Sequence, residues 1–141
     1  MESQEKLEYG LKVYGKIMGE DKAEVMRAQA ESKGFASRLT GMALNYAFAD
    51  VWGDGGLELK QRSLVTIAIL IATRQTLELK NHIRIGVRNG LTVRELEQVL
   101  YQCVPYLGFP AAATATTVMI EVLRELGLDL ESKTAEERGL L

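Results

Sequence analysis

The segment RSLVTIAILIATRQTLELKNHIRIGVRNG, residues 62–90, decides the fold class of this 141-residue chain and carries its one histidine, His82. The first half of the segment is apolar on nearly every side, and its β-branched run Val65-Thr66-Ile67 would also suit a strand. We favour a buried helix over residues 59–73, because the apolar stretch is long and no other segment alternates like a strand that could pair with it. The chain is therefore predicted to be all-α.

A second helix is predicted from Thr76 to the Asn89-Gly90 pair, which is typical of a helix C-terminus. Within it Glu78 lies four residues before His82, so a carboxylate and an imidazole share one helical face. We expect Glu78 to orient the ring and to favour its protonated form, as in an acid–base pair. The alternative is a surface pair worth about 0.2–0.5 kcal/mol, or a histidine that only contacts core residues.

Three helices are predicted before residue 59. Residues 2–17 carry one apolar stripe that ends at the stop signal Gly19, and residues 22–33 form a shorter polar helix. Residues 35–52 form the third helix, which the loop GDGG at 53–56 follows. The side chains that we expect to face inward are Leu7, Leu11, Tyr14, Ile17, Phe35, Leu39, Met42, Tyr46 and either Ala49 or Ala43.

Two further helices are predicted near the C-terminus. Thr92 and Glu95 fit a capping box at the start of one helix, which we expect to end ahead of Pro105. Pro110 suits the first turn of the last helix, which reaches Leu126. The sequence thus predicts five to seven helices in all.

Composition and charge narrow the class of protein. The length predicts one domain, over residues 1–130, and a charged tail at 131–141 that we expect to fray. A net charge of −2 argues against a nucleic-acid partner. A single cysteine, Cys103, excludes an internal disulfide, fits a reducing cytoplasm and, with one histidine, leaves no transition-metal site.

The charged N-terminus lacks a signal sequence and no apolar run could cross a membrane, so we expect a soluble, cytoplasmic protein. An apolar share of 47% in so small a chain favours self-association.

Four pieces of the sequence, in order and at matching spacing, resemble the carboxymuconolactone decarboxylase family. They are GLELKQRSLVTIAIL at 56–70, LELKNHIR at 77–84, NGLTVRELEQVL at 89–100 and YLGFPAA at 106–112. The resemblance extends over residues 7–126 and implies an all-α helical bundle whose subunits assemble into rings, as trimers or hexamers.

The resemblance also implies a function. The activity after which the family is named is cofactor-free removal of CO₂ from 4-carboxymuconolactone in aromatic catabolism, the β-ketoadipate pathway. The conjugated lactone carbonyl accepts the electron pair that CO₂ leaves behind. The protein must then hold the carboxylate, stabilise the oxyanion and protonate carbon. We therefore expect a carboxy-lyase that binds a small carboxylated molecule and needs neither cofactor nor metal.

Residue by residue, the resemblance makes His82 and Glu78 the expected catalytic pair. Arg62, with its planar guanidinium, is expected to bind a substrate carboxylate. Arg84 lies about 200° around the helix from His82, so a subunit interface suits it better than the same substrate site. The remaining candidates for substrate binding are Trp52, Gln102 and Tyr106, each of which could equally be a packing residue.

Two positions depart from the family pattern. Asp54 stands where the loop after Trp52 often carries an arginine, and Gln102 stands where a second family histidine is found. A different small carboxylated or lactone substrate, or a non-catalytic ligand-binding oligomer, therefore remains an alternative.

Thiol peroxidase chemistry of the related alkylhydroperoxidase D type is disfavoured. That branch uses a Cys-x-x-Cys-x-x-x-His site, and Gln75 and Glu78 occupy its two cysteine positions here. The carboxylate that the branch carries upstream would fall near Ser63, which cannot act as a base.

Overall fold

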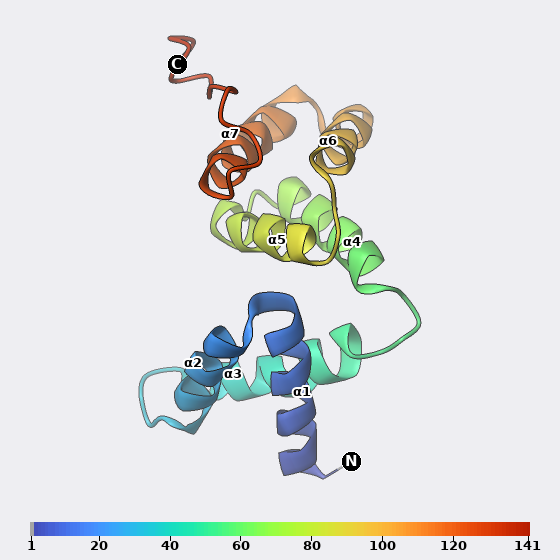
Figure 1. Ribbon diagram of the computed structural model, residues 1–141, viewed down its shortest axis with the longest axis vertical. Helices are drawn as coiled ribbons and strands as arrows, with labels where there is room; N and C mark the ends of the chain where they lie inside the picture. Colours follow the sequence, from blue (N-terminus) through green and yellow to red (C-terminus); the bar gives the residue numbers. More distant parts are fainter. Residues whose placement is uncertain (1) are drawn as a thin grey trace. The chain divides into compact units, whose positions relative to one another are not determined.

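The computed structural model describes residues 2–141, which form seven α-helices and one π-helix and contain no strand (Figure 1). The all-α class is thus confirmed. The chain divides into two compact units, one ending at Leu59 and the other running from Lys60 to Leu141. The single domain over residues 1–130, the separate tail and the ring assembly stay predictions. Within residues 2–141 no helix is both long and apolar enough to cross a membrane.

The first unit is built on a capped and amphipathic N-terminal helix. Its elements are α1 (Ser3–Met18), α2 (Glu20–Glu31), α3 (Ser37–Met42) and the π-helix η1 (Ala43–Trp52). The apolar stripe predicted for α1 is confirmed, because Leu11 and Ile17 are buried and Leu7 and Tyr14 are half-buried. Tyr14 also meets the ring of Phe48 edge to face, with 4.9 Å between ring centroids.

Helix α1 approaches η1 closely at Gly10. A Cβ atom at this position would overlap the carbonyl oxygen of Leu44, so only glycine permits the approach. The neighbouring Tyr9 hydroxyl donates a hydrogen bond of 2.7 Å to the carbonyl of Gly53, just past the end of η1. Both contacts hold the C-terminal end of the unit in place.

The predicted inward face of residues 35–52 is wrong in its first half. The helix starts at Ser37, and Phe35, Leu39, Met42 and Tyr46 are exposed, by 101%, 64%, 57% and 70%. The buried side chains are Leu44 and Trp52, together with Ala49, which was predicted to face inward. From residue 43 the backbone is a π-helix with i to i+5 hydrogen bonds, so side chains no longer recur every 3.6 residues. This change of period accounts for Tyr46. Phe35 precedes the helix, and Leu39 and Met42 lie in α3, which has no buried residue.

The second unit encloses the main hydrophobic core between four longer helices. These are α4 (Leu59–Ala72), α5 (Thr76–Arg88), α6 (Val93–Leu107) and α7 (Phe109–Glu125). Each contributes fully buried side chains, among them Ile67, Ile83, Leu96 and Val122. Leucine, isoleucine and valine at helical spacing thus account for the packing of this unit.

Helix α4 confirms the helical prediction for residues 59–73 and corrects the idea that it is buried all round. Ser63, Ile67 and Ile71 are buried at intervals of four residues. Val65 and Ile69 lie on the other side and are 53% and 55% exposed. The helix is therefore a surface helix whose exposed face is also apolar.

The start of α6 agrees with the prediction and its end does not. The capping box is confirmed, because the Glu95 amide donates to the Thr92 hydroxyl and the Thr92 amide donates to the Glu95 carboxylate, each at 3.1 Å. The predicted end before Pro105 is wrong, because α6 continues to Leu107 with this proline inside it. Pro105 removes the hydrogen bond to the carbonyl of Tyr101, which lies on the exposed side of the helix where water can replace the lost donor.

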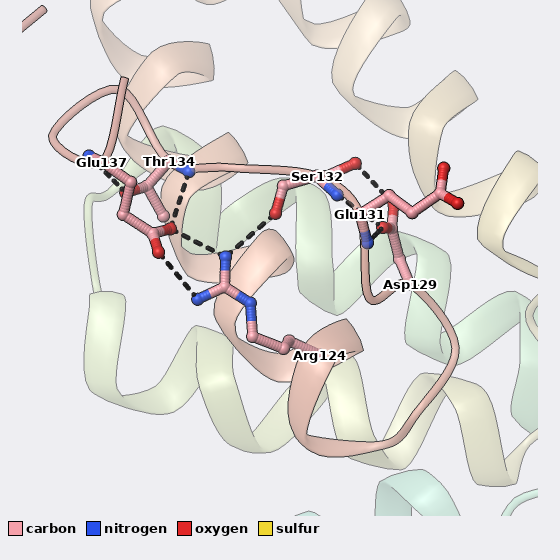
Figure 2. A network of polar contacts seen from close by, with 6 residues as sticks. All are labelled: Arg124, Asp129, Glu131, Ser132, Thr134 and Glu137. Carbon is pink, nitrogen blue, oxygen red and sulfur yellow. Dashed lines mark hydrogen bonds and ion pairs between the residues drawn. The ribbon is translucent and has the colours of Figure 1, made fainter. Parts of the chain in front are cut away.

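The C-terminal tail, which we expected to fray, is held against α7. Figure 2 shows the Arg124 guanidinium between the Glu137 carboxylate, at 2.7 Å, and the Ser132 carbonyl, at 2.9 Å. Thr134 is only 6% exposed, and its amide donates to Glu137 at 3.0 Å. Asp129 accepts hydrogen bonds from Ser132 at the start of the tail. The prediction of a frayed tail was based on its charged composition. It did not foresee that Arg124, Asp129 and Glu137 each have a specific hydrogen-bond partner.

Candidate active site

Helix α5 presents Glu78 and His82 on one face, as their spacing predicts. Glu78 lies in the first turn and is exposed, whereas His82 is half-buried beside the fully buried Leu79 and Ile83. The acid is thus solvated and the imidazole is partly shielded from water. This asymmetry decides the protonation state of the histidine.

Burial lowers the pKa of His82 below its ordinary value of 6.5, and the opposing charge of Glu78 raises it by less. The expectation that Glu78 favours the protonated form is confirmed in direction, but burial outweighs it and was not foreseen. The free energy lost when the charged imidazolium leaves water is larger than its attraction to the exposed Glu78 carboxylate, because water screens that attraction. Near pH 7 the ring of His82 is neutral and can donate one N–H hydrogen bond.

Arg62 lies in the second turn of α4 and is half-buried. The neighbouring Ser63 is fully buried, and its hydroxyl oxygen accepts a hydrogen bond of 2.9 Å from the Asn89 amide. Asn89 is the C-terminal cap of α5, so this bond ties the start of α4 to the end of the helix that carries His82. Sequence reasoning noted Ser63 only as a position that could not be a base and missed this link, which pairs residues 26 positions apart.

Arg84 bonds within its own unit. Its guanidinium lies 2.8 Å from a carboxylate oxygen of Glu125 on α7 and 3.2 Å from the side-chain oxygen of Asn81. The same face of α5 carries Lys80, which pairs with Glu121 on α7 at 3.2 Å. These pairs join α5 to α7. The role of Arg84 at a subunit interface or with substrate stays a prediction.

A cavity of about 460 Å³ lies between α4 and α6. Gln102 is the one candidate residue from the sequence that lines it. The lining residues are Leu64, Ala68, Glu95, Gln98, Val99, Gln102 and Cys103. His82, Glu78 and Arg62 are not among them, so the structure does not gather the predicted site residues in this cavity. Gln98 was missed, although its position one turn before Gln102 on α6 was visible in the sequence.

The two aromatic candidates differ in environment. Tyr106 is 78% exposed in the last turn of α6 and lies outside the α4–α6 cavity. Trp52 ends η1 in the first unit and is only 9% exposed, as a packing residue would be. The loop after it is shaped by Asp54, whose carboxylate accepts a hydrogen bond of 2.7 Å from the amide of Gly56. The substrate-binding roles of Trp52 and Tyr106 stay predictions.

Among residues 2–141 no three His, Cys, Asp or Glu side chains are arranged to hold a metal ion. Burial raises the pKa of the Cys103 thiol, so this side chain is a poor nucleophile near pH 7.

Comparison with known proteins gives two relatives and one family. The chain is 33% identical to the 4-carboxymuconolactone decarboxylase of Acinetobacter baylyi over 128 residues, which cover 91% of this chain and 94% of that protein. It is 28% identical to the nitrosuccinic acid decarboxylase of Metarhizium robertsii over 117 residues, 83% of this chain and 80% of that protein. A sequence model of the carboxymuconolactone decarboxylase family matches residues 38–121. Because that match spans more than half of the chain and both relatives are named as decarboxylases, the chain belongs to the carboxymuconolactone decarboxylase family and is a decarboxylase-like lyase.

Proposed function

We propose that this chain removes CO₂ from a small carboxylated molecule without a cofactor, with His82 and Glu78 as its acid–base pair. Arg62 is the proposed group that binds a substrate carboxylate through its planar guanidinium. The observation that carries the proposal is the half-buried imidazole of His82, whose pKa is lowered by burial, within the segment that the family matches.

The reaction needs an electron sink in the substrate and a proton for carbon. The bond between the substrate carbon and its carboxylate breaks, and the electron pair moves into a conjugated electron-accepting group. A new C–H bond then forms, so one proton is consumed for each CO₂ released. Electrons balance without an oxidant or a reductant.

A neutral imidazole suits both halves of this reaction. Its N–H can donate a hydrogen bond to the oxygen that gains negative charge as CO₂ leaves. The same growing charge raises the pKa of the ring, which can then take a proton from solvent and deliver it to carbon. Glu78 acts in the same direction, because its charge also favours the protonated ring.

The names of the two relatives define a class of substrate. One acts on 4-carboxymuconolactone and the other on nitrosuccinic acid. A conjugated lactone carbonyl and a nitro group are both electron sinks next to carboxylates. We propose the same class for this chain, that is, a small carboxylic acid with a conjugated carbonyl or a nitro group. Asp54, where the family often carries an arginine, favours a member of that class with fewer negative charges than 4-carboxymuconolactone.

The direct test is to incubate the purified protein with 4-carboxymuconolactone, and separately with nitrosuccinic acid, and to follow ultraviolet loss of substrate together with CO₂ release. Release of one CO₂ for each molecule of either compound consumed supports the proposal. The compound that reacts shows whether the electron-accepting group is a lactone carbonyl or a nitro group. Failure to consume either compound, with bound ligand still raising the melting temperature, would favour the non-catalytic ligand-binding alternative.

We also propose that the protein assembles into a homo-oligomeric ring, a trimer or hexamer. The exposed apolar side chains of Phe35, Leu39, Met42 and Tyr46 support self-association, since exposed patches of this kind commonly mark interfaces. Light scattering at micromolar concentration tests it, and a monomer would contradict it.

A further inference from the structure

The α4–α6 cavity has the dimensions and walls of a small-molecule site. Its volume of about 460 Å³ falls inside the range of roughly 300–1,000 Å³ that is common for ligand pockets. Leu64 and Ala68 form one wall from α4, and Val99 and Cys103 form the other from α6. An apolar body of a ligand would therefore be shielded from water on two sides.

The charges around this cavity cancel. One oxygen of the Glu95 carboxylate lies 2.8 Å from the Lys60 ammonium, and the other accepts the Thr92 amide at 3.1 Å. The Cys103 thiol is buried, and its raised pKa keeps it neutral. A carboxylate placed here would meet no cation in the lining, and a cation would meet a carboxylate that is already paired. The cavity therefore disfavours charged ligands.

Two carboxamides supply the remaining polarity. Gln98 and Gln102 lie one turn apart on the same face of α6 and both line the cavity. Both side chains are exposed, so their amides are accessible to a ligand, which would replace water on them. Each amide offers N–H donors and a carbonyl acceptor, which suit a ligand carbonyl or hydroxyl group.

This cavity is separate from His82, Glu78 and Arg62, the three residues of the proposed decarboxylation, although it holds one sequence candidate, Gln102. No residue of α5, and so neither Glu78 nor His82, lines it. Arg62 is two residues from Leu64, which places it about 200° around α4 and away from the cavity wall. The cavity thus offers no cation of its own for the carboxylate that a decarboxylase must bind.

We infer that the α4–α6 cavity is a second ligand site, which binds a small uncharged molecule with an apolar body and a carbonyl or hydroxyl group held by Gln98 and Gln102. His82, Glu78 and Arg62, the groups of the proposed reaction, take no part in this site. The inference assigns Gln102, a substrate-binding candidate from the sequence, to the second site instead.

The test uses a matched pair of probes with one carbon skeleton, γ-nonalactone and its ring-opened anion 4-hydroxynonanoate. Binding of each is measured by calorimetry and by ligand-observed NMR. The binding site is then located by alkylating Cys103 with N-ethylmaleimide. Cys103 is the one cysteine of the chain and lines the cavity, so a ligand bound there should protect it. We expect the lactone to bind and to slow alkylation, and the anion to do neither.

Variants distinguish binding in this cavity from binding elsewhere on the protein. Gln98→Leu and Gln102→Leu should each weaken lactone binding by about twofold to tenfold, the value of one neutral hydrogen bond. Ala68→Phe should abolish binding by filling the cavity, and circular dichroism shows whether it folds. Gln29→Leu, on the exposed face of α2, is the matched control and should bind like the wild type.

The outcomes decide the inference in either direction. Absence of lactone binding, equal binding of lactone and anion, or unchanged binding by the Gln98→Leu/Gln102→Leu double variant would each overturn it. His82→Gln should still bind the lactone. Failure of the decarboxylation assay with lactone binding intact therefore counts against the proposed function alone.

Discussion

The Glu78–His82 face of α5 and the α4–α6 cavity are two polar regions of the same unit, and they differ in kind. The first has titratable groups and a nearby guanidinium-bearing helix, but its residues do not line the cavity. The second has a well-formed cavity, and its only charged group is paired. The titratable pair and the cavity therefore lie on different helix faces in this chain.

The comparison teaches that burial acts differently in the two regions. At His82 it changes a protonation state, because a charged form competes with a neutral one. Gln98 and Gln102 are exposed and carry no titrating group, so no protonation state changes there. Helix α4 carries Arg62 on one face and the cavity residues Leu64 and Ala68 on another. Substitutions on either side can separate the two.

The largest effect is expected at His82. His82→Gln keeps a hydrogen-bond donor of similar size and removes the titrating ring, so kcat for decarboxylation should fall by about 10²–10⁴. KM should change much less if the residue acts on the transition state. Steady-state kinetics and a thermal melt measure this, with Glu31→Gln as an exposed control. A folded variant with unchanged turnover would remove the catalytic role of the α5 pair.

A smaller effect on stability is expected where α4 meets α5. Ser63→Ala removes the acceptor for the Asn89 amide in a fully buried position, so the free energy of unfolding should fall by about 1–3 kcal/mol. Urea unfolding measures it, and Ser3→Ala, exposed in the first turn of α1, is the control. Equal stability of Ser63→Ala and wild type would show that this bond does not hold the two helices together.

The local part of the fold could be predicted from the sequence. The Thr92–Glu95 capping box, the α1 stripe and the helical register of Glu78 and His82 each depend on residues within a few turns of one helix. Such features need no knowledge of the rest of the chain. The candidate pair on α5 was found for this reason.

The rest of the site depends on information that spacing does not contain. The π-helical backbone after Met42 changed which side chains are buried, and Pro105 stayed inside a helix because its neighbours face solvent. The lowered pKa of His82 required knowing how deeply the ring lies. Gln98 gained significance only when the structure placed it with Leu64 and Ala68 of α4 in the lining of one cavity.

The protonation state of His82 tests the electrostatic side of the comparison. Its imidazole is the only one in the chain, so one set of NMR signals reports its titration. We expect a pKa below 6.5, and a further decrease in Glu78→Gln, because the variant loses the charge that raises it. A pKa above 6.5 would show that Glu78 outweighs burial.

The same shift predicts a dependence of stability on pH. The folded pKa is lowered, so as the pH falls through about 6.5 the unfolded chain takes up a proton before the folded chain does. His82 therefore stabilises the fold less at low pH, down to its folded pKa. Urea unfolding of wild type and His82→Gln at pH 7.5 and 5.5 isolates this contribution, because the carboxylates are common to both. An identical pH dependence for the two proteins would contradict it.

The smallest effect is expected at the tail, far in sequence from both polar regions. Arg124→Met removes the group that bonds Glu137 and the Ser132 carbonyl, but all of these lie near the surface, where ion pairs contribute little to global stability. The melting temperature should hardly change, whereas trypsin should cleave after Lys133 faster than in wild type, because the tail opens locally. The variant Arg38→Met on α3 controls for loss of a surface charge. Equal cleavage rates at Lys133 would mean that the tail is held by contacts other than Arg124, such as the burial of Thr134.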